Sequence, residues 1–245
     1  MPNPPNIAAV PAAILAGGLA TRLRPITEKI PKALVEVAGK PFIDHHLSLL
    51  RENGIRQVVI CAGYKGEMLR DHVGNGSAFD LRVDYSFDGE KLLGTAGALK
   101  RAAHLLGEVF WVTYGDSYMD IDYRTILDFF LARNVLGLMT VIENGDRWDK
   151  SNAVFEHGRL VRYDKQIRSP EMKHIDYGVA LLCRAVLDGV PLDQPTDLAG
   201  IYTNLVEAGQ MVGHEVFNRF YEMGSPQGLQ ETRAYLLSRN RTSEP

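Results

Sequence analysis

The first 140 residues alternate between short apolar runs and amphipathic runs, and this order restricts the possible fold more than any other feature. The β-rich apolar runs predict strands at residues 10–15, 57–62, 81–85, 109–114 and 136–143. Helical patterns lie between them, at residues 41–53, 95–106 and 123–134. Strands separated by helices pair in parallel, in a sheet that helices cover on both faces. We therefore predict an α/β protein with a Rossmann-like, mixed but mainly parallel sheet flanked by helices.

The pattern changes after about residue 150. Residues 152–165 predict a hairpin that turns at His157-Gly158, and residues 176–187 predict a strand leading into a helix. A later strand is expected at residues 214–224, before a terminal helix. Because no repeat or low-complexity linker interrupts the chain, we expect one domain over residues 1–245, with a first half of about 8–145 and a second of about 146–240.

Composition excludes several classes of protein. The formal net charge of -3 leaves no basic surplus for nucleic acid. No apolar run approaches the roughly 20 residues of a membrane helix, and the N-terminus lacks the basic start of a secretory signal. Both cysteines, Cys61 and Cys183, lie in apolar runs that predict buried, reduced thiols. We expect a cytoplasmic protein with no nucleic-acid or membrane partner.

Ligands of such sheets bind beyond the carboxyl ends of the strands, so the loop after Leu15 is a first candidate. Gly17 and Gly18 lack Cβ atoms there, which lets backbone N–H groups approach phosphate oxygens or a base. Arg22 offers a planar fork for phosphate and Lys32 a compact charge. The alternative is a tight turn with solvated basic side chains. Neither a Walker loop nor a GxGxxG fingerprint is present, which argues against an NAD(P)-dependent reductase.

Asp116 is the first candidate for a metal ligand, because it ends the strand VFWVTYGD at the same edge of the sheet. A helix cap is the alternative for an aspartate in this position. No Ser-His-Asp or Cys-His arrangement is apparent. The adjacent pair His45-His46 is predicted to lie on the polar face of the first helix.

Residues 15–41, LAGGLATRLRPITEKIPKALVEVAGKP, resemble the signature of the sugar-1-phosphate nucleotidylyltransferases, or NDP-sugar pyrophosphorylases. Their pattern is L-A-G-G-x-G-T-R-L-x-P-L-T followed by P-K and G-K-P, and Ala20 replaces its third glycine here. The resemblance implies the nucleotide-diphospho-sugar transferase fold, with a nucleotide-binding first half and a sugar-binding second half. It implies catalytic roles for Arg22, Lys32 and Asp116. It places the nucleotide against Leu15, Ala16, Gly17, Gly18, Thr21 and Arg22.

Three later segments extend the resemblance. In FYEMGSPQGL, Glu222 stands at the aspartate of D-x-G-[TS]-P, which implies Mg²⁺ held by Asp116 and Glu222. VRYDKQ resembles the E-K-P segment and assigns the sugar phosphate to Lys165. HIDYGVALL resembles N-x-G-[IV]-Y, which places Asp176, Tyr177 and Gly178 at the sugar.

The segment DGEKLLGTAGALKRA is similar to E-P-L-G-T-A-G of guanylyltransferases for mannose-like sugars, with Lys91 in place of proline. By this resemblance Glu90, Gly94 and Thr95 meet the base, and a carboxylate at Glu90 suits the donors of guanine. The chain resembles the heptose-1-phosphate and mannose-1-phosphate guanylyltransferases in particular. Transfer from GTP to a heptose or mannose type of sugar 1-phosphate, in nucleotide-sugar and polysaccharide biosynthesis, is therefore the expected function.

Two alternatives remain open. One is a uridylyltransferase that acts on N-acetylmuramate 1-phosphate or another hexose 1-phosphate. The other is a non-catalytic nucleotide-sugar sensor, which predicts loss of Arg22, Lys32 or the carboxylates, although all of these are present or conservatively replaced. Substrates are the expected small-molecule partners, and a homodimer is compatible with the sequence.

Overall fold

The computed structural model describes residues 6–242. The strands are β1 (Ala12–Ala16), β2 (Glu36–Val37), β3 (Lys40–Pro41), β4 (Gln57–Ala62), β5 (Arg82–Phe87), β6 (Val109–Tyr114), β7 (Ser117–Tyr118), β8 (Gly137–Glu143), β9 (Ala153–Glu156), β10 (Arg159–Tyr163), β11 (His174–Cys183), β12 (Met211–Glu215) and β13 (Tyr221–Glu222). The α-helices are α1 (Ile26–Lys29), α2 (Phe42–Glu52), α3 (Gly66–Val73), α4 (Gly94–Ala102), α5 (Tyr123–Leu131), α6 (Leu198–Glu207) and α7 (Pro226–Thr242).

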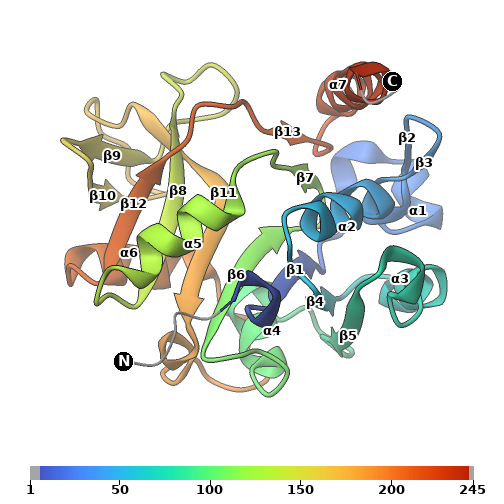
Figure 1. Cartoon of the computed structure of the whole chain (residues 1–245), viewed down its shortest axis with the longest axis horizontal. Coiled ribbons are helices and arrows are strands. Elements are labelled where there is room, and N and C mark those ends of the chain that lie inside the picture. The colour runs from blue at the N-terminus through green and yellow to red at the C-terminus, as the bar shows by residue number, and fades with distance from the viewer. Residues whose placement is uncertain (1–5, 243–245) are drawn as a thin grey trace.

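Over the described residues, nine strands form one sheet in the order β10-β9-β11-β6-β1-β4-β5, with β8 and β12 continuing from β11. β1 pairs in parallel with β4 and β6, and β4 pairs in parallel with β5. β11 runs antiparallel to β6, β8 and β9. The predicted mixed, mainly parallel sheet is confirmed. Because β11 lies between β6 and β8, the two predicted halves share a single sheet (Figure 1).

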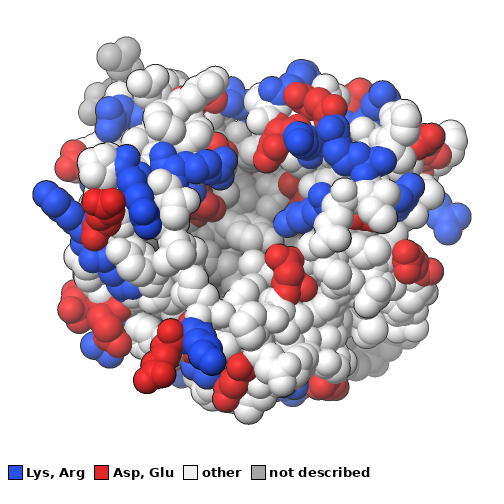
Figure 2. All heavy atoms as spheres, turned by 180° about the vertical axis from the view of Figure 1, so that it is seen from behind, with Lys and Arg blue, Asp and Glu red and all other residues white. Residues whose placement is uncertain are grey.

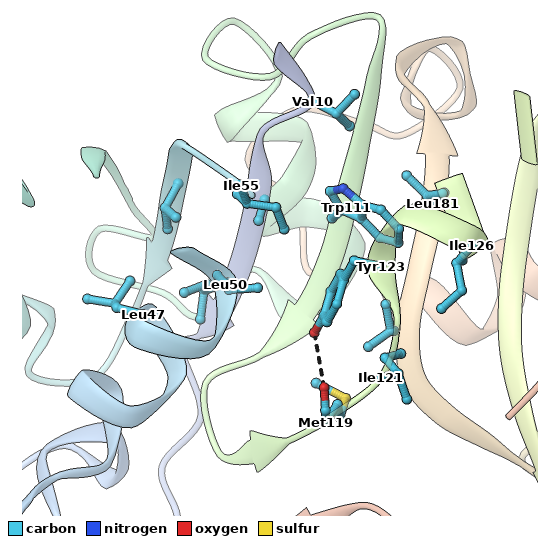
Figure 3. Close-up of a cluster of buried hydrophobic side chains, with 14 of the residues drawn as sticks. Val10, Leu47, Leu50, Ile55, Trp111, Met119, Ile121, Tyr123, Ile126 and Leu181 are labelled. Carbon is cyan, nitrogen blue, oxygen red and sulfur yellow. Dashed lines mark hydrogen bonds between the residues drawn. The ribbon is translucent and has the colours of Figure 1, made fainter. Parts of the chain in front are cut away.

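One face of the sheet carries α2, α3 and α5, of which α2 and α5 lie in front of the sheet in Figure 1. α2 buries Ile43, Leu47 and Leu50, whose spacing of four and three residues places them on one side of a helix. Trp111 of β6 is fully buried and meets Tyr123 of α5 edge to face, with ring centroids 5.1 Å apart (Figure 3). This cluster attaches both helices to the middle of the sheet.

The other face is covered by α4 and α6. α6 begins at Asp197, whose side chain accepts a hydrogen bond from the backbone N–H of Ala199 at 2.7 Å. Sequence reasoning missed both α6 and the eight-residue α3, because neither has a long amphipathic period. The hairpin turn is confirmed: His157 and Gly158 both have positive φ, 51° and 75°, as a two-residue hairpin loop of type I′ requires.

The strand predicted at residues 214–224 is wrong in its extent. β12 ends at Glu215, and the chain then turns where the Asn218 amide donates to the backbone carbonyl of Asp120 at 3.0 Å. β13 pairs instead with β7 in a separate two-stranded sheet, with Glu222 opposite Ser117. This pairing brings the last segment of the chain back to the carboxyl end of β6.

His45 and His46 were predicted on the polar face of α2, and this prediction is wrong. His46 is completely buried, and its two ring nitrogens have no hydrogen-bond partner among residues 6–242. His45 is also buried, with Nε2 2.7 Å from the Val37 carbonyl. The reason is that β2, β3 and α7 cover the side of α2 that faces away from the sheet. Burial lowers the pKa of His46 to about 4, and the nearby Asp116 charge only partly opposes this.

This low pKa makes stability depend on pH. Below pH 6.5 the unfolded chain binds a proton at His46 while the folded chain does not, so the free energy of unfolding falls as the pH drops from 6.5 toward 4. His46→Leu removes this loss. Between pH 7.5 and 5, its unfolding free energy should fall about 2 kcal/mol less than that of the wild type. Urea denaturation at both pH values measures the difference, with exposed His104→Leu as the control. Equal pH dependence of His46→Leu and wild type would contradict the prediction.

Candidate active site

Two adjoining cavities lie at the carboxyl ends of β1 and β6, the edge where ligands were expected. The smaller, of about 270 Å³, is lined by the loop after β1 and by Lys32. The larger, of about 770 Å³, extends between β11 and the start of α7. Arg22 and Asp116 line both. The face opposite to the view of Figure 1 is hollowed near its centre, with Lys and Arg side chains on both sides of the hollow (Figure 2).

The loop after β1 is open toward the smaller cavity. A Cβ atom built on Gly18 would meet no atom within 4 Å, so the backbone here is accessible to a ligand. Ala20 has φ 49° and ψ 44°, the left-handed conformation that favours the glycine of the family pattern. The Thr27 hydroxyl donates to the Ala20 carbonyl at 2.8 Å and holds this turn. The 3₁₀ helix Thr21–Leu23 follows and carries Arg22 into the site.

Lys32 and Asp116 form the central contact. The Lys32 ammonium lies 2.6 Å from Oδ2 of Asp116, and the Ser117 hydroxyl donates to Oδ1 at 3.1 Å. The Lys32 side chain is 14% exposed and that of Asp116 37%, so the pair is partly screened from water while the carboxylate stays accessible. The structure thus brings together two residues that lie 84 positions apart in the sequence.

Glu222 reaches the same place from the C-terminal segment. Its carboxylate accepts hydrogen bonds from the Gly224 N–H and, at 3.3 Å, from the Ser225 hydroxyl. Ser225 in turn caps α7 by accepting the N–H of Gly228 at 3.0 Å. A Cβ atom at Gly224 would meet the Glu222 carboxylate and the Arg22 guanidinium, so any other residue here would displace one of these two side chains. The helix-cap and metal-ligand interpretations of this motif are therefore compatible in space.

The donor set fits a particular kind of metal site. Asp116 and Glu222 are carboxylates on the wall of one cavity. Among residues 6–242 no group of three Asp, Glu, His or Cys side chains could hold a metal by itself. Mg²⁺ commonly binds one or two carboxylates and completes its shell with substrate phosphates and water. The two carboxylates suit such a shared ion.

The residues predicted to contact the sugar all border the larger cavity: Lys165, Asp176, Tyr177 and Gly178. The backbone N–H of Asp176 donates to the Asn152 amide oxygen, and the Asp176 carboxylate accepts the N–H of Gly178, both at 2.9 Å. Burial raises the pKa of Asp176, and the Lys165 charge opposes the rise. The Tyr177 side chain is only 2% exposed and packs on Phe220. It therefore belongs mainly to the core.

The structure places Glu90, Gly94 and Thr95 outside both cavities. The first N–H groups of α4 were expected to be free for a base, but those of Ala96 and Gly97 donate to the Thr196 carbonyl at 2.9 and 3.3 Å. The Thr95 hydroxyl accepts the N–H of Leu198 at 2.7 Å.

Asp88 lies closer to the glycine loop and was missed by sequence reasoning. It is 6% exposed, and its Oδ2 atom would be 3.2 Å from a Cβ atom on Gly17. The same oxygen accepts the Leu93 N–H at 3.2 Å, and burial raises the pKa of this carboxyl. Its position before Gly89 is typical of a turn, and only the packing of β5 beside β4 reveals its proximity to Gly17.

Comparison with known proteins identifies the class. The pattern of the nucleotidyl transferase family matches residues 11–163, more than half of the chain. The chain therefore belongs to the nucleotidyl transferase family, as the resemblance in the sequence predicts.

Relatives within this family differ in their nucleotide. The chain is 29% identical over 233 residues to mannose-1-phosphate guanylyltransferase of Mycobacterium tuberculosis, covering 93% of this chain and 65% of the relative. It is 42% identical over 113 residues to N-acetylmuramate alpha-1-phosphate uridylyltransferase of Neisseria meningitidis, covering 46% of this chain and 49% of the relative. The chain thus spans between about half and two thirds of the length of these relatives.

The fold agrees with solved structures. A protein of Bacillus anthracis assigned as a glucose-1-phosphate thymidylyltransferase superposes with a TM-score of 0.82 at 21% identity, covering 93% of this chain and 95% of that one. This likeness supports the nucleotidyltransferase type of α/β fold. Within residues 6–242, no helix combines the length and apolarity needed to cross a membrane.

The left-handed conformation of Ala20 can be tested directly. An L-residue there costs about 1–2 kcal/mol, while glycine costs about 0.4–1 kcal/mol through the unfolded chain. Ala20→Gly should therefore raise the free energy of unfolding by about 0.5–1 kcal/mol, measured by urea denaturation. Ala103→Gly, at a residue with right-handed φ -55°, should lower it and is the control. A loss of stability in Ala20→Gly as large as in Ala103→Gly would refute the assigned strain.

Proposed function

We propose that this protein transfers a nucleotidyl group from a nucleoside triphosphate to a sugar 1-phosphate. The contact of Lys32 with Asp116 at 2.6 Å, between the glycine loop and the larger cavity, is the observation that carries the proposal. An oxygen of the sugar phosphate forms a bond to the α-phosphorus. The bond from this phosphorus to the oxygen bridging to the β-phosphate breaks, and pyrophosphate leaves.

The chain's own residues position the reactants and balance charge. A phosphate monoester is anionic near neutral pH, so the attacking oxygen needs no general base. Arg22 borders both cavities and holds the triphosphate with its planar fork. Lys32, fixed by Asp116, places a positive charge where charge develops on the reacting phosphates. The arrangement favours in-line transfer by orientation and electrostatics.

Asp116 and Glu222 would hold Mg²⁺ together with the triphosphate. The ion supplies charge neutralisation and orientation of the phosphates when it is bound. Glu222 has one methylene more than the aspartate of the family pattern, and its carboxylate accepts a hydrogen bond from the Gly224 N–H. This extra length lets the side chain reach the cavity from β13.

Sugar binding falls to the larger cavity. Lys165 there meets the sugar phosphate, and Asp176 with Gly178 meets sugar hydroxyls. A heptose or mannose type of sugar is the favoured acceptor, which agrees with the guanylyltransferase among the relatives. N-acetylmuramate 1-phosphate with UTP is the second candidate, and the 42% identity over 113 residues to an enzyme of that name favours it.

For the base we favour guanine read by Asp88 rather than by Glu90. A buried carboxylate beside Gly17 can accept the two adjacent N–H donors of a guanine edge. Neither residue borders a cavity, but Asp88 is buried beside the glycine loop whereas Glu90 is exposed.

Turnover of purified protein tests the reaction class. Each of the four NTPs is incubated with a panel of sugar 1-phosphates and Mg²⁺, and pyrophosphate release is measured. We expect release that requires both substrates, with GTP and a mannose-type sugar 1-phosphate preferred. Absence of release with every pair would refute the proposed activity, whereas preference for UTP with N-acetylmuramate 1-phosphate would select the second candidate.

Asp116→Asn should lower kcat by about 10²–10³ or more, because the site loses the charge that orders Lys32 and the metal. Circular dichroism should show an unchanged fold. Exposed Asp128→Asn on α5 is the matched control and should keep wild-type kcat. Wild-type turnover of Asp116→Asn at saturating Mg²⁺ would rule out the metal assignment.

Asp88→Asn should reduce the preference for GTP over UTP, measured as a ratio of kcat/KM, by about 10–100-fold. In this variant an NH₂ donor replaces one of the two acceptor oxygens. The lost hydrogen bond to a charged group contributes about 1.5–3 kcal/mol. Glu90→Gln provides the comparison, since the amide makes the same change at the exposed position. A loss of preference in Glu90→Gln alone would return base reading to Glu90.

A further inference from the structure

A wall of the larger cavity has no role in the reaction described above. We define it by four residues: Arg147, Trp148, Arg219 and Phe220. The guanidinium carbons of Arg147 and Arg219 lie 4.8 and 5.5 Å from the Trp148 ring centroid. Phe220 meets Trp148 edge to face at 5.8 Å. Two cations therefore lie close to an indole ring that borders a ligand-sized cavity.

The loop from Asn144 to Ser151 fixes this wall in place. Asn144 is completely buried, and its amide donates to the Asp149 carbonyl at 2.6 Å and to the Ser151 hydroxyl at 3.1 Å. Its side-chain oxygen accepts the Trp148 N–H at 3.2 Å. The Ser151 N–H donates to Asp146 at 2.7 Å. This network fixes the backbone that carries Arg147 and Trp148.

The charge of Arg147 is not balanced by a nearby acid. Its guanidinium donates to the carbonyls of Asn144 and Glu143 at 2.9 and 2.8 Å, and both acceptors are neutral. Within residues 6–242 no carboxylate forms an ion pair with it. Asp149 also borders the cavity, but its carboxylate accepts the Lys150 N–H at 2.7 Å and is not among the ion pairs of the described residues.

Arg219 is placed differently. It pairs with Glu231, which also accepts the Gln227 amide at 2.9 Å. Its Nε atom is buried without a hydrogen-bond partner in the described part of the chain. Arg147 is therefore the cation that stays available for a ligand, and Arg219 supports the aromatic ring.

The anomeric phosphate does not account for this cation. Lys165, Lys32 and Arg22 already border the region where two phosphates react. An additional fixed guanidinium beside an aromatic ring suits a ligand with a second anionic group and an apolar sugar face. The cavity of about 770 Å³ is toward the upper end of the size of small-molecule sites, so it can hold a substituent beyond the ring.

We propose that the wall of Arg147, Trp148, Arg219 and Phe220 recognises a sugar 1-phosphate that carries a second anionic group, a carboxylate or phosphate, on the part of the sugar remote from the anomeric carbon. This inference rests on the proposed function, because it takes the larger cavity as the sugar site. Arg147 binds the second anion, and Trp148 packs on the sugar ring. Within the heptose or mannose type favoured above, a sugar 1-phosphate with a second anionic group is then a better substrate than its neutral counterpart.

Paired sugars test the proposal without any mutation. Glucose 1-phosphate is compared with glucuronic acid 1-phosphate, and mannose 1-phosphate with mannose 1,6-bisphosphate, by pyrophosphate release at saturating NTP and Mg²⁺. The wild type should have a KM about 10–100-fold lower for at least one acidic member than for its neutral partner, as one charge-assisted hydrogen bond implies. Equal KM values within both pairs would overturn the proposal.

Arg147→Gln locates the effect. It should raise the KM for the preferred acidic sugar about 10–100-fold, while the KM for the neutral partner and for NTP changes less than about 3-fold. Arg147→Lys, which keeps the charge but loses the planar fork, should recover part of the affinity. Arg159→Gln on β10, an exposed arginine away from both cavities, is the control and should match the wild type. An equal rise for acidic and neutral sugars in Arg147→Gln would show a merely structural role.

Calorimetric titration separates this inference from the proposed function. The same four sugars are titrated into wild type and Arg147→Gln without measuring turnover. Selective binding of an acidic sugar that Arg147→Gln abolishes, with no pyrophosphate release from any pair, would support the anion site and refute the transferase activity. Pyrophosphate release with neither binding nor KM selectivity for acidic sugars would leave the activity and refute the anion site.

Discussion

The ion pair between Lys32 and Asp116 is the interaction on which the site depends. Lys32 comes from the glycine-loop segment and Asp116 from the end of β6, and their contact at 2.6 Å ties the loop to the sheet. With Ser117 on the other carboxylate oxygen, the side chain of Asp116 is held in one orientation. Both side chains are partly shielded, so water screens their charges less than it would at the surface. The pair can therefore interact electrostatically with phosphates in either cavity.

Two further elements bring charged side chains to the cavity wall beside this pair. Arg22 leads into both cavities because the left-handed turn at Ala20 directs the chain over the end of β1. Glu222 lies beside Asp116 because β13 pairs with β7, the strand that begins directly after Asp116. The Met223 N–H also donates to the Asp116 carbonyl at 2.9 Å. Asp116 is thus positioned because it follows β6 directly in the chain, and Glu222 because β13 pairs with β7.

Much of the fold was predictable because apolar periodicity is local. β4 and the hairpin at His157-Gly158 match the expected segments. The order of the longer strands and helices through β8 also matches, apart from α3 and the short elements α1, β2, β3 and β7. The burial of His46 was not predictable, since it results from the covering of α2 by distant parts of the chain. Asp88 was missed for a similar reason, because a carboxylate in a turn looks solvated until the neighbouring strand is placed. The wall around Trp148 matches no motif and depends on a loop whose shape is set by one buried asparagine.

The pairing of β13 with β7 also bears on how the chain acquires its site during synthesis. A ribosome releases the chain from its N-terminus, and the glycine loop, Lys32 and Asp116 emerge long before Glu222. Until the segment from Tyr221 to Ser225 is free to pair with β7, the larger cavity lacks the wall that contains Glu222 and Ser225. Gly224 is then also absent from its place beside Arg22. A nascent chain can therefore hold a nearly complete sheet while its phosphate-binding apparatus is still unfinished. The site is therefore completed only after the strands of the large sheet have been synthesised, when the segment before α7 pairs with β7.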